Sequence, residues 1–177
     1  QRKRYCCNGR VVEIAKCEGC GNWKFRWAST DTWKSVKEMA ENLANRIVDR
    51  MFNNDPFSQW LGIERVEVGA GKCVLRMTVR KEMLNGFSVA HGGITYSLAD
   101  SALAFAANAH GIQSMSIETS ISHTKKVVEG DVLSATAKEV SLTIRIGIYQ
   151  ICITNQNNDM VALFKGTVYR TGNEWEV

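Results

Sequence analysis

The segment LNGFSVAHGGITYSLADSALAFAANAHG, from Leu84 to Gly111, holds the residues of this chain best suited to chemistry. Residues 94–109 read as a helix that is apolar on almost every face, yet Asp100 interrupts it. Burying an unpaired carboxylate is costly and raises its pKa. Asp100 is therefore a candidate general base for water or a candidate nucleophile. The alternative is a structural carboxylate capped by hydroxyl groups such as those of Ser97 and Ser101.

Two glycines, Gly92 and Gly93, stand at the start of this helix, directly after His91. The first turn of a helix leaves backbone N–H groups without intrahelical acceptors, and glycine has no side chain that would keep a ligand away. Both glycines are thus candidate donors to a carbonyl oxygen that gains charge as its carbon becomes tetrahedral. Alone, the pair would more often serve a sharp turn or close packing. The presence of Asn85, His91 and Asp100 in the same segment favours the interpretation of the glycines as donors to a ligand.

The spacing between donor and acid has a consequence for assembly. Eight residues of helix separate Gly92 from Asp100, about 12 Å along the axis. A reacting carbon must lie about 3 Å from both the donor and the attacking group, so one chain cannot supply both. Two antiparallel helices from a two-fold dimer can, with two equal sites between the subunits.

The elements that must position these residues follow from periodicity and turn signals. Apolar residues at helical spacing predict an amphipathic helix over 35–52, ended by Asn53-Asn54-Asp55-Pro56. Two strands within 62–79, joined by a turn at 69–71, precede the apolar helix, and four strands follow it, at about 112–121, 131–140, 144–154 and 161–170. This order predicts an α+β fold in which a curved antiparallel sheet wraps around a central helix.

Composition sets outer bounds. The 177 residues suit one domain with a short appendage, and 45% hydrophobic and 23% charged residues are ordinary for a globular protein. The formal charge of +4 comes from scattered basic residues, which argues against a nucleic-acid partner. No apolar run approaches the roughly 20 residues of a membrane span, and no secretory h-region follows the basic start. We therefore expect a cytoplasmic protein with no membrane partner, and its cysteines as thiols.

Residues 1–32 differ in composition from the remainder, taken as one domain over 33–177. They hold Cys6, Cys7, Cys17 and Cys20 and lack a clean period, which favours an irregular extension. Cys17 and Cys20 have the spacing of a zinc knuckle, but the adjacent Cys6-Cys7 pair makes awkward tetrahedral ligands. We expect no metal site.

The quoted segment resembles hotdog-fold acyl-CoA thioesterases of the phenylacetate-degradation type, in which an Asn-Gly loop precedes HGG and a Leu-Ala-Asp helix. The resemblance continues through EGDVLSATAKEV and ALFKGTVYR and spans about Val36 to Gly172. It implies a hotdog fold, thioester hydrolysis, and a homodimer with shared sites that often pairs into a homotetramer. No cofactor is implied, because coenzyme A arrives as part of the substrate.

The resemblance also assigns roles by position. Asp100 matches the catalytic acid, Gly92 the donor to the carbonyl, and Asn85 and His91 the polar pair beside the carbonyl and the leaving sulfur. His91 has an equal alternative in bracing the loop before the helix. Ser116 falls where related enzymes place a serine that helps to position water.

One departure from the family pattern concerns the phosphates of coenzyme A. Where an Arg-Pro pair is common, this chain has Lys125 and Lys126, which are phosphate candidates or simply a solvated pair. Arg170 is a further phosphate candidate. His110 and His123 are expected at element ends without chemistry.

The function expected from these observations is hydrolysis of an aryl- or medium-chain acyl-CoA to a free acid and coenzyme A. Two alternatives stay open. A hotdog dehydratase would use a histidine with a carboxylate, and a non-catalytic protein would only bind acyl-CoA.

Overall fold

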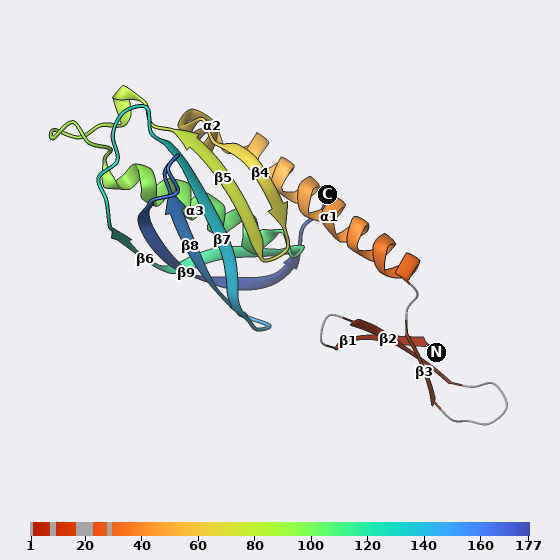
Figure 1. Ribbon diagram of the computed structural model, residues 1–177. Helices are drawn as coiled ribbons and strands as arrows, with labels where there is room; N and C mark the ends of the chain where they lie inside the picture. The colour runs from red at the N-terminus through yellow and green to blue at the C-terminus, as the bar shows by residue number, and fades with distance from the viewer. Residues whose placement is uncertain (1, 8–9, 17–22, 28–29) are drawn as a thin grey trace. The chain divides into compact units, whose positions relative to one another are not determined.

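The computed structural model describes the backbone of residues 2–7, 10–16, 23–27 and 30–177, and the side chains of 34–36 and 38–177 (Figure 1). The chain divides into two compact units, Gln1–Ala40 and Glu41–Val177. Within the described residues, no helix is both long and apolar enough to cross a bilayer.

The first unit contains a small antiparallel sheet where the sequence favoured an irregular segment. Its strands are β1 (Arg2–Cys7), β2 (Arg10–Lys16) and β3 (Trp23–Trp27), in the order β1-β2-β3. The difference has a local cause, because β2 carries three β-branched residues, Val11, Val12 and Ile14, which favour extended backbone. Cys17 and Cys20, which have the spacing of a zinc knuckle, lie outside the described residues, as do the side chains of Cys6 and Cys7.

Two helices precede the main sheet. α1 spans Thr30–Asn53 and ends at the predicted stop signal. The same signal begins a short helix that the sequence analysis did not anticipate, α2 (Pro56–Leu61). Asp55 is its N-cap and accepts a bond from the Ser58 amide at 3.0 Å, while Pro56 occupies the first turn, where a missing N–H costs nothing. One proline therefore both ends one helix and starts the next.

The second unit is built on a six-stranded antiparallel sheet in the order β4-β5-β7-β8-β9-β6 (Figure 1). The predicted turn at 69–71 joins the first two strands, and the four later strands occur where alternation placed them. The strands are β4 (Glu64–Gly69), β5 (Lys72–Thr78), β6 (Ile112–His123), β7 (Val132–Leu142), β8 (Ile146–Thr154) and β9 (Met160–Glu174). β4 and β6 are the edges. A short 3-10 helix at Lys81–Met83 leads into the segment that carries the predicted site.

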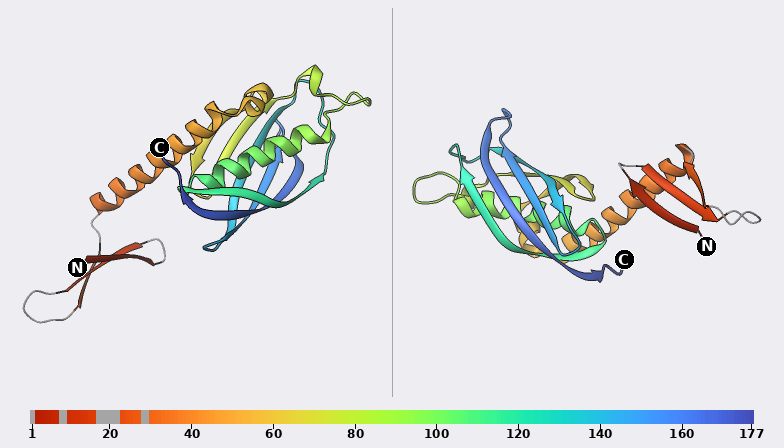
Figure 2. Two further views of the ribbon diagram at one scale, coloured as in Figure 1. Left: turned by 180° about the vertical axis from the view of Figure 1, so that it is seen from behind. Right: turned by 90° about the horizontal axis from the view of Figure 1, so that it is seen from below.

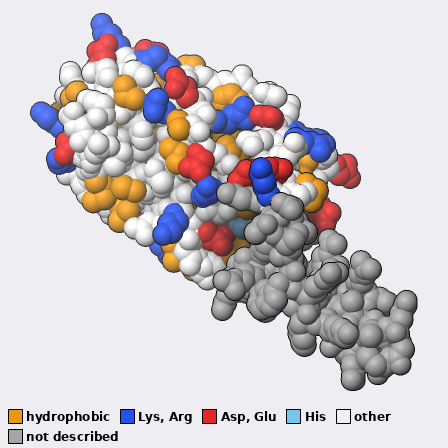
Figure 3. Space-filling model, turned by 45° about the vertical axis from the view of Figure 1, so that its right-hand side comes forward, with side chains coloured by type: hydrophobic (Ala, Val, Ile, Leu, Met, Phe, Trp, Pro, Cys, Tyr) orange, Lys and Arg blue, Asp and Glu red, His pale blue; other side chains and the backbone are white. Residues whose placement is uncertain are grey.

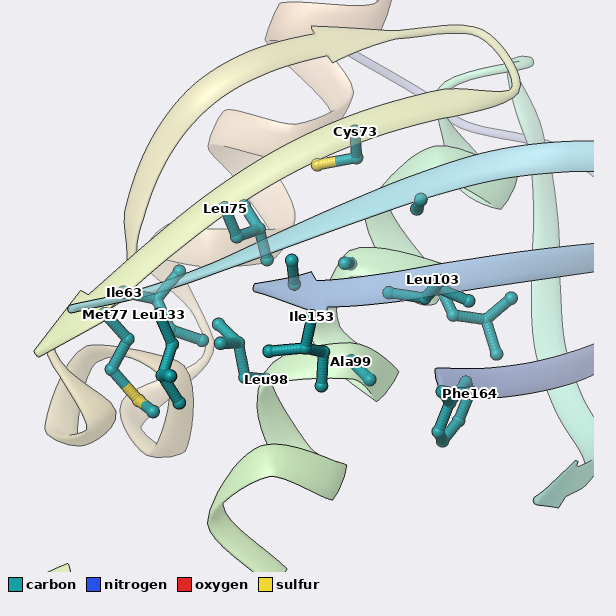
Figure 4. Close-up of a cluster of buried hydrophobic side chains, with 14 of the residues drawn as sticks. Ile63, Cys73, Leu75, Met77, Leu98, Ala99, Leu103, Leu133, Ile153 and Phe164 are labelled. Atoms are coloured by element: carbon teal, nitrogen blue, oxygen red, sulfur yellow. The ribbon is translucent and has the colours of Figure 1, made fainter. Parts of the chain in front are cut away.

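The central helix α3 (Gly92–Asn108) lies against the concave side of this sheet (Figure 2). Leu98, Ala99 and Leu103 of α3 meet apolar side chains of the sheet such as Leu133 and Phe164 (Figure 4). The predicted α+β class, with a curved antiparallel sheet around a central helix, is confirmed.

One face of α3 is not enclosed by its own chain. Ser97, Asp100, Ser101 and Ala104 are only half-buried, and their spacing of three and four residues places them on one side of the helix. The sheet of the same chain therefore leaves this stripe, which includes Asp100, uncovered. The sheet covers the opposite side, where the side chains are apolar.

Candidate active site

The start of α3 presents one free backbone donor. His91 is the N-cap, and its Nδ1 accepts the Gly93 N–H at 3.0 Å, while its carbonyl accepts the Ile94 N–H at 2.8 Å. The Gly92 N–H has no acceptor among the described residues. Of the two glycines expected to act together, only Gly92 is open to a ligand, because the cap occupies the Gly93 amide.

The surroundings of Gly92 form a cavity of about 410 Å³, here called the helix-start cavity. It is bordered by Gly92, Thr95, His123, Lys125 and Lys126. His123, expected to be without chemistry, lies directly against Gly92, since a Cβ built on that glycine would be 3.3 Å from the His123 Cε1. The sequence carried no signal for this contact, because His123 ends a strand far along the chain.

Asp100 lies in the middle of the half-buried stripe and borders two cavities, of about 650 and 440 Å³. Its carboxylate has no hydrogen-bond or ion-pair partner among the described residues. The structural alternative of capping by Ser97 or Ser101 does not hold, because Ser97 Oγ donates to the Gly93 carbonyl at 2.7 Å and Ser101 Oγ pairs with Ser58 Oγ at 3.0 Å. Burial raises the pKa of the Asp100 carboxyl. An unsatisfied, desolvated carboxylate facing a cavity is a suitable base or nucleophile.

Ser116 shares the smaller Asp100 cavity, although it belongs to the edge strand β6. It stands at a register shift in the pairing of β6 with β9, between Ser116 and Glu118. Bulges of this kind often redirect side chains at sites. The structure thus brings together two predicted residues, Asp100 and Ser116.

Asn85 and His91 have mainly structural contacts in this structure. Asn85 Oδ1 accepts the Phe87 N–H at 2.8 Å and the Val89 N–H at 3.4 Å, which closes the loop before the helix. Asn85 borders none of the three cavities described here. His91 caps α3, which is the bracing role left open by the sequence.

The three candidates for binding the phosphates, Lys125, Lys126 and Arg170, do not all lie together. Lys126 borders the helix-start cavity and has no acidic partner among the described residues. Lys125 borders it too but donates to Asp159 at 2.8 Å, a bond that lowers the pKa of Asp159. Arg170 lies elsewhere. Its backbone is opposite Ser114 in the β6–β9 ladder, at the other end of β6, and its Nη1 donates to the Thr143 carbonyl at 2.9 Å. Within one chain, Arg170 therefore cannot act beside the two lysines.

Among the described side chains, charged and metal-ligating groups form no further site. In the part of the chain whose side chains are described, no group of three or more His, Cys, Asp or Glu residues could hold a metal ion. Basic and acidic side chains are interspersed on the face shown in Figure 3.

Comparison with known proteins gives consistent matches. The model of the thioesterase superfamily matches residues 87–162. A putative esterase of Archaeoglobus fulgidus is 41% identical over 75% of this chain and 86% of its own length. The acyl-coenzyme A thioesterase PaaI of Escherichia coli is 38% identical over 69% of this chain and 87% of its own. The solved structure of the E. coli PaaI protein superposes with a TM-score of 0.74 at 36% identity, covering 76% of this chain and 98% of that one.

Proposed function

The chain belongs to the thioesterase superfamily as a PaaI-like hotdog thioester hydrolase, and we propose from this premise that it cleaves aryl- or medium-chain acyl-CoA to a free acid and coenzyme A. The observation that carries this proposal is the unpartnered, desolvated Asp100 carboxylate, which shares a cavity with Ser116. Hydrolysis needs a base or nucleophile in such a place.

The reaction assigns one role to each group. The Gly92 N–H donates to the thioester oxygen as it becomes an oxyanion. The Asp100 carboxylate either takes a proton from a water that attacks the carbonyl carbon, or attacks that carbon itself to form an anhydride that water opens. In both routes the carbon–sulfur bond breaks and coenzyme A leaves as a thiolate. Ser116 holds the water in the first route.

Isotope labelling separates the two routes. In a single turnover in ¹⁸O-water, the nucleophilic route places the label in the Asp100 carboxylate when water attacks its side of the anhydride. The general-base route places it only in the released acid. Mass spectrometry of the peptide that contains Asp100 distinguishes these results.

We propose that each site combines Gly92 of one protomer with Asp100 of its partner. The half-buried stripe on α3 leaves Asp100 uncovered within one chain. The neighbouring edge strand β6 exposes Met115 and Ile117 to 63% and 60%, and long apolar edges seldom stay unpaired. Both features favour a two-fold homodimer over this face. A dimer of two such dimers, with no nucleic-acid or membrane partner, completes the proposed assembly.

The acyl group is assigned to the larger Asp100 cavity. Phe57, Tyr96, Phe105 and Trp175 border it with apolar or aromatic surface. Its volume of about 650 Å³ is sufficient for an aryl ring or a medium alkyl chain. Lys126, together with Lys125, is assigned to the phosphates of coenzyme A.

A thiol-release screen over aryl- and alkyl-CoA thioesters tests the activity. Thiol release with at least one class is the expected result. Binding of acyl-CoA without release would instead favour the non-catalytic alternative. Hydration of an enoyl-CoA without release would favour the dehydratase, although Asp100 has no histidine partner among the described residues.

Mixed dimers test the shared site. Asp100→Asn removes the acid, and Gly92→Pro removes the donor N–H, because proline has none. Each homodimer should be inactive. A heterodimer of the two variants keeps one site with both native groups and should regain about half of the parental activity on the two-fold arrangement. Heterodimers as inactive as both parents would contradict the shared site.

A further inference from the structure

We infer that Thr95 and His123 are positioning residues, which hold the peptide group after Gly92 so that the Gly92 N–H stays aimed at the substrate. This inference rests on the proposed role of Gly92 as the carbonyl donor. Neither residue was a candidate from the sequence. His123 acts through Thr95 and not on the substrate.

The hydrogen bonds at Thr95 have only one consistent direction. Thr95 Oγ1 lies 3.0 Å from the Gly92 carbonyl oxygen, which can only accept, so the hydroxyl donates its single proton there. His123 Nε2 lies 2.7 Å from the same hydroxyl oxygen. With that proton on the Gly92 carbonyl, the His123 tautomer that carries its proton on Nε2 donates to Oγ1. Thr95 is 2% exposed, so its hydroxyl has no competing contact with bulk water.

These bonds act on one of the two peptide groups that meet at Gly92. The peptide before Gly92 carries the free N–H, and its His91 carbonyl is held by the Ile94 amide at 2.8 Å. The peptide after Gly92 is held at both ends, by Gly93 N–H to His91 Nδ1 at 3.0 Å and by the Thr95 hydroxyl. Glycine has the widest backbone freedom of any residue. Fixing both peptide groups therefore preorganises the donor, which is what stabilises a developing charge most effectively.

The main sheet fixes the position of His123. His123 is the last residue of β6 and pairs with Ala162 of β9, so its backbone belongs to the regular ladder. Its ring lies against Gly92 and leaves no room for a side chain there without a shift. The His123–Thr95–Gly92 chain thus links the helix start to the sheet, and a site held by regular elements is positioned more accurately than one held by loops.

Near-isosteric substitutions test this chain of bonds. Thr95→Val removes the hydroxyl and should lower kcat about 10- to 100-fold, as misplaced catalytic donors do, with KM within about two-fold of the parent. His123→Phe removes the Nε2–H and should lower kcat about 10-fold on the same grounds, whereas His123→Gln keeps a side-chain N–H donor and should retain most activity. Thr143→Val, which removes a hydroxyl at the β7–β8 turn, is the matched control and should keep the parental kcat.

The double variant tests whether His123 acts through Thr95. If it does, Thr95→Val/His123→Phe should be no more than about two-fold slower than Thr95→Val alone, because the second change removes a bond that has already lost its acceptor. Multiplying losses in kcat would show that His123 acts on its own and would overturn the inference. So would a Thr95→Val enzyme with parental kcat and only a lower melting temperature.

Hydrogen exchange gives a readout that does not depend on turnover. Amides of residues 91–95 should exchange faster in Thr95→Val and His123→Phe than in the parent, with Thr143→Val unchanged. If the parent released no thiol from any acyl-CoA, the proposed function would fail, and exchange would still decide the positioning. Equal exchange in all four proteins would overturn the inference alone.

Discussion

The amide of Gly92 and the carboxylate of Asp100 belong to one helix but line different cavities. Gly92 opens to the helix-start cavity beside His123, whereas Asp100 opens to two cavities along the half-buried stripe of α3. Eight residues of helix, about 12 Å, account for the separation. One chain thus supplies both the donor N–H and the acid, but they do not meet in one cavity.

Asp100→Asn should lower kcat about 10²- to 10⁴-fold, the usual contribution of a positioned base. The change should not weaken the fold at neutral pH. Burial raises the pKa of Asp100 in the folded state, so the ionised carboxylate opposes folding, and a neutral amide removes this opposition. Thiol release and thermal melting measure the two effects. Asp49→Asn, at an exposed ion pair, is the control and should keep the parental rate. Parental turnover in Asp100→Asn would contradict the assignment.

The pH dependence of kcat/KM should show an acidic limb at a higher pH than an ordinary aspartate would give. The ordinary pKa is 3.8, and burial raises it, so Asp100 becomes protonated and inactive before a solvated aspartate would. The contribution of Asp100 to folding stability changes with pH in the opposite direction to its contribution to activity. The stabilisation is fully present below the pKa that Asp100 has in the unfolded chain, and it is lost as pH rises through the pKa of Asp100 in the folded state. A pH–rate profile that stays flat down to 3.8 would refute this prediction.

Gly92→Ala and Gly92→Pro should differ sharply in rate. Both add a Cβ near His123 Cε1, but only proline removes the N–H. Proline suits the first position of a helix, and His91, with φ −59° and ψ 135°, already has the conformation preferred before proline. We expect Gly92→Pro to lose about 10²- to 10³-fold in kcat, as when an oxyanion donor is removed. Equal rates in the two variants would exclude the N–H as the donor.

Trp175→Ala should change the preference among acyl groups. The Trp175 indole borders both Asp100 cavities and is held by its Nε1–H, which donates to Asn108 Oδ1 at 2.9 Å. Removing the indole enlarges the larger Asp100 cavity, to which the acyl group is assigned. The kcat/KM for long acyl chains should therefore rise relative to the kcat/KM for short ones. Trp175→Phe keeps an aromatic ring and serves as the control. An unchanged ratio across a series of chain lengths would exclude Trp175 as a wall of the acyl site.

Gly166→Ala should destabilise the protein by about 1–3 kcal/mol through overpacking. A Cβ at Gly166 would lie 2.4 Å from Leu103 Cδ2, where α3 approaches β9. Leu103→Ala removes that clash at the cost of a cavity, so the double variant should lose less stability than the two single losses together. Denaturant unfolding measures all three. Gly86→Ala, with no atom of a described residue within 4 Å of the added Cβ, should leave stability nearly unchanged, and an equal loss there would refute the packing argument.

Much of the second unit could be predicted because its signals are local. The alternation of apolar and polar residues marked β4 to β9. The glycines marked the turn at 69–71, and the apolar run marked α3. Short elements escaped prediction. α2 depends on one cap and one proline, β1 and β2 lack a clear alternation, and the alternation of β3 (Trp23–Trp27) covers only five residues. Hydrogen-bond assignments escaped it as well, as the Asn85 and Gly93 bonds illustrate.

The sequence by itself determined the order of the central helix and the six strands around it, the family, and the presence of an acid eight residues beyond Gly92, because periodicity and motif spacing are properties of neighbouring residues. Only the tertiary structure decided that Gly92 has the free amide, that Asp100 and Ser116 share a cavity, and that His123 reaches Thr95. Those relations join residues 16 to 28 positions apart, or depend on which side chain takes a given hydrogen bond. The packing of α3 against the sheet sets them.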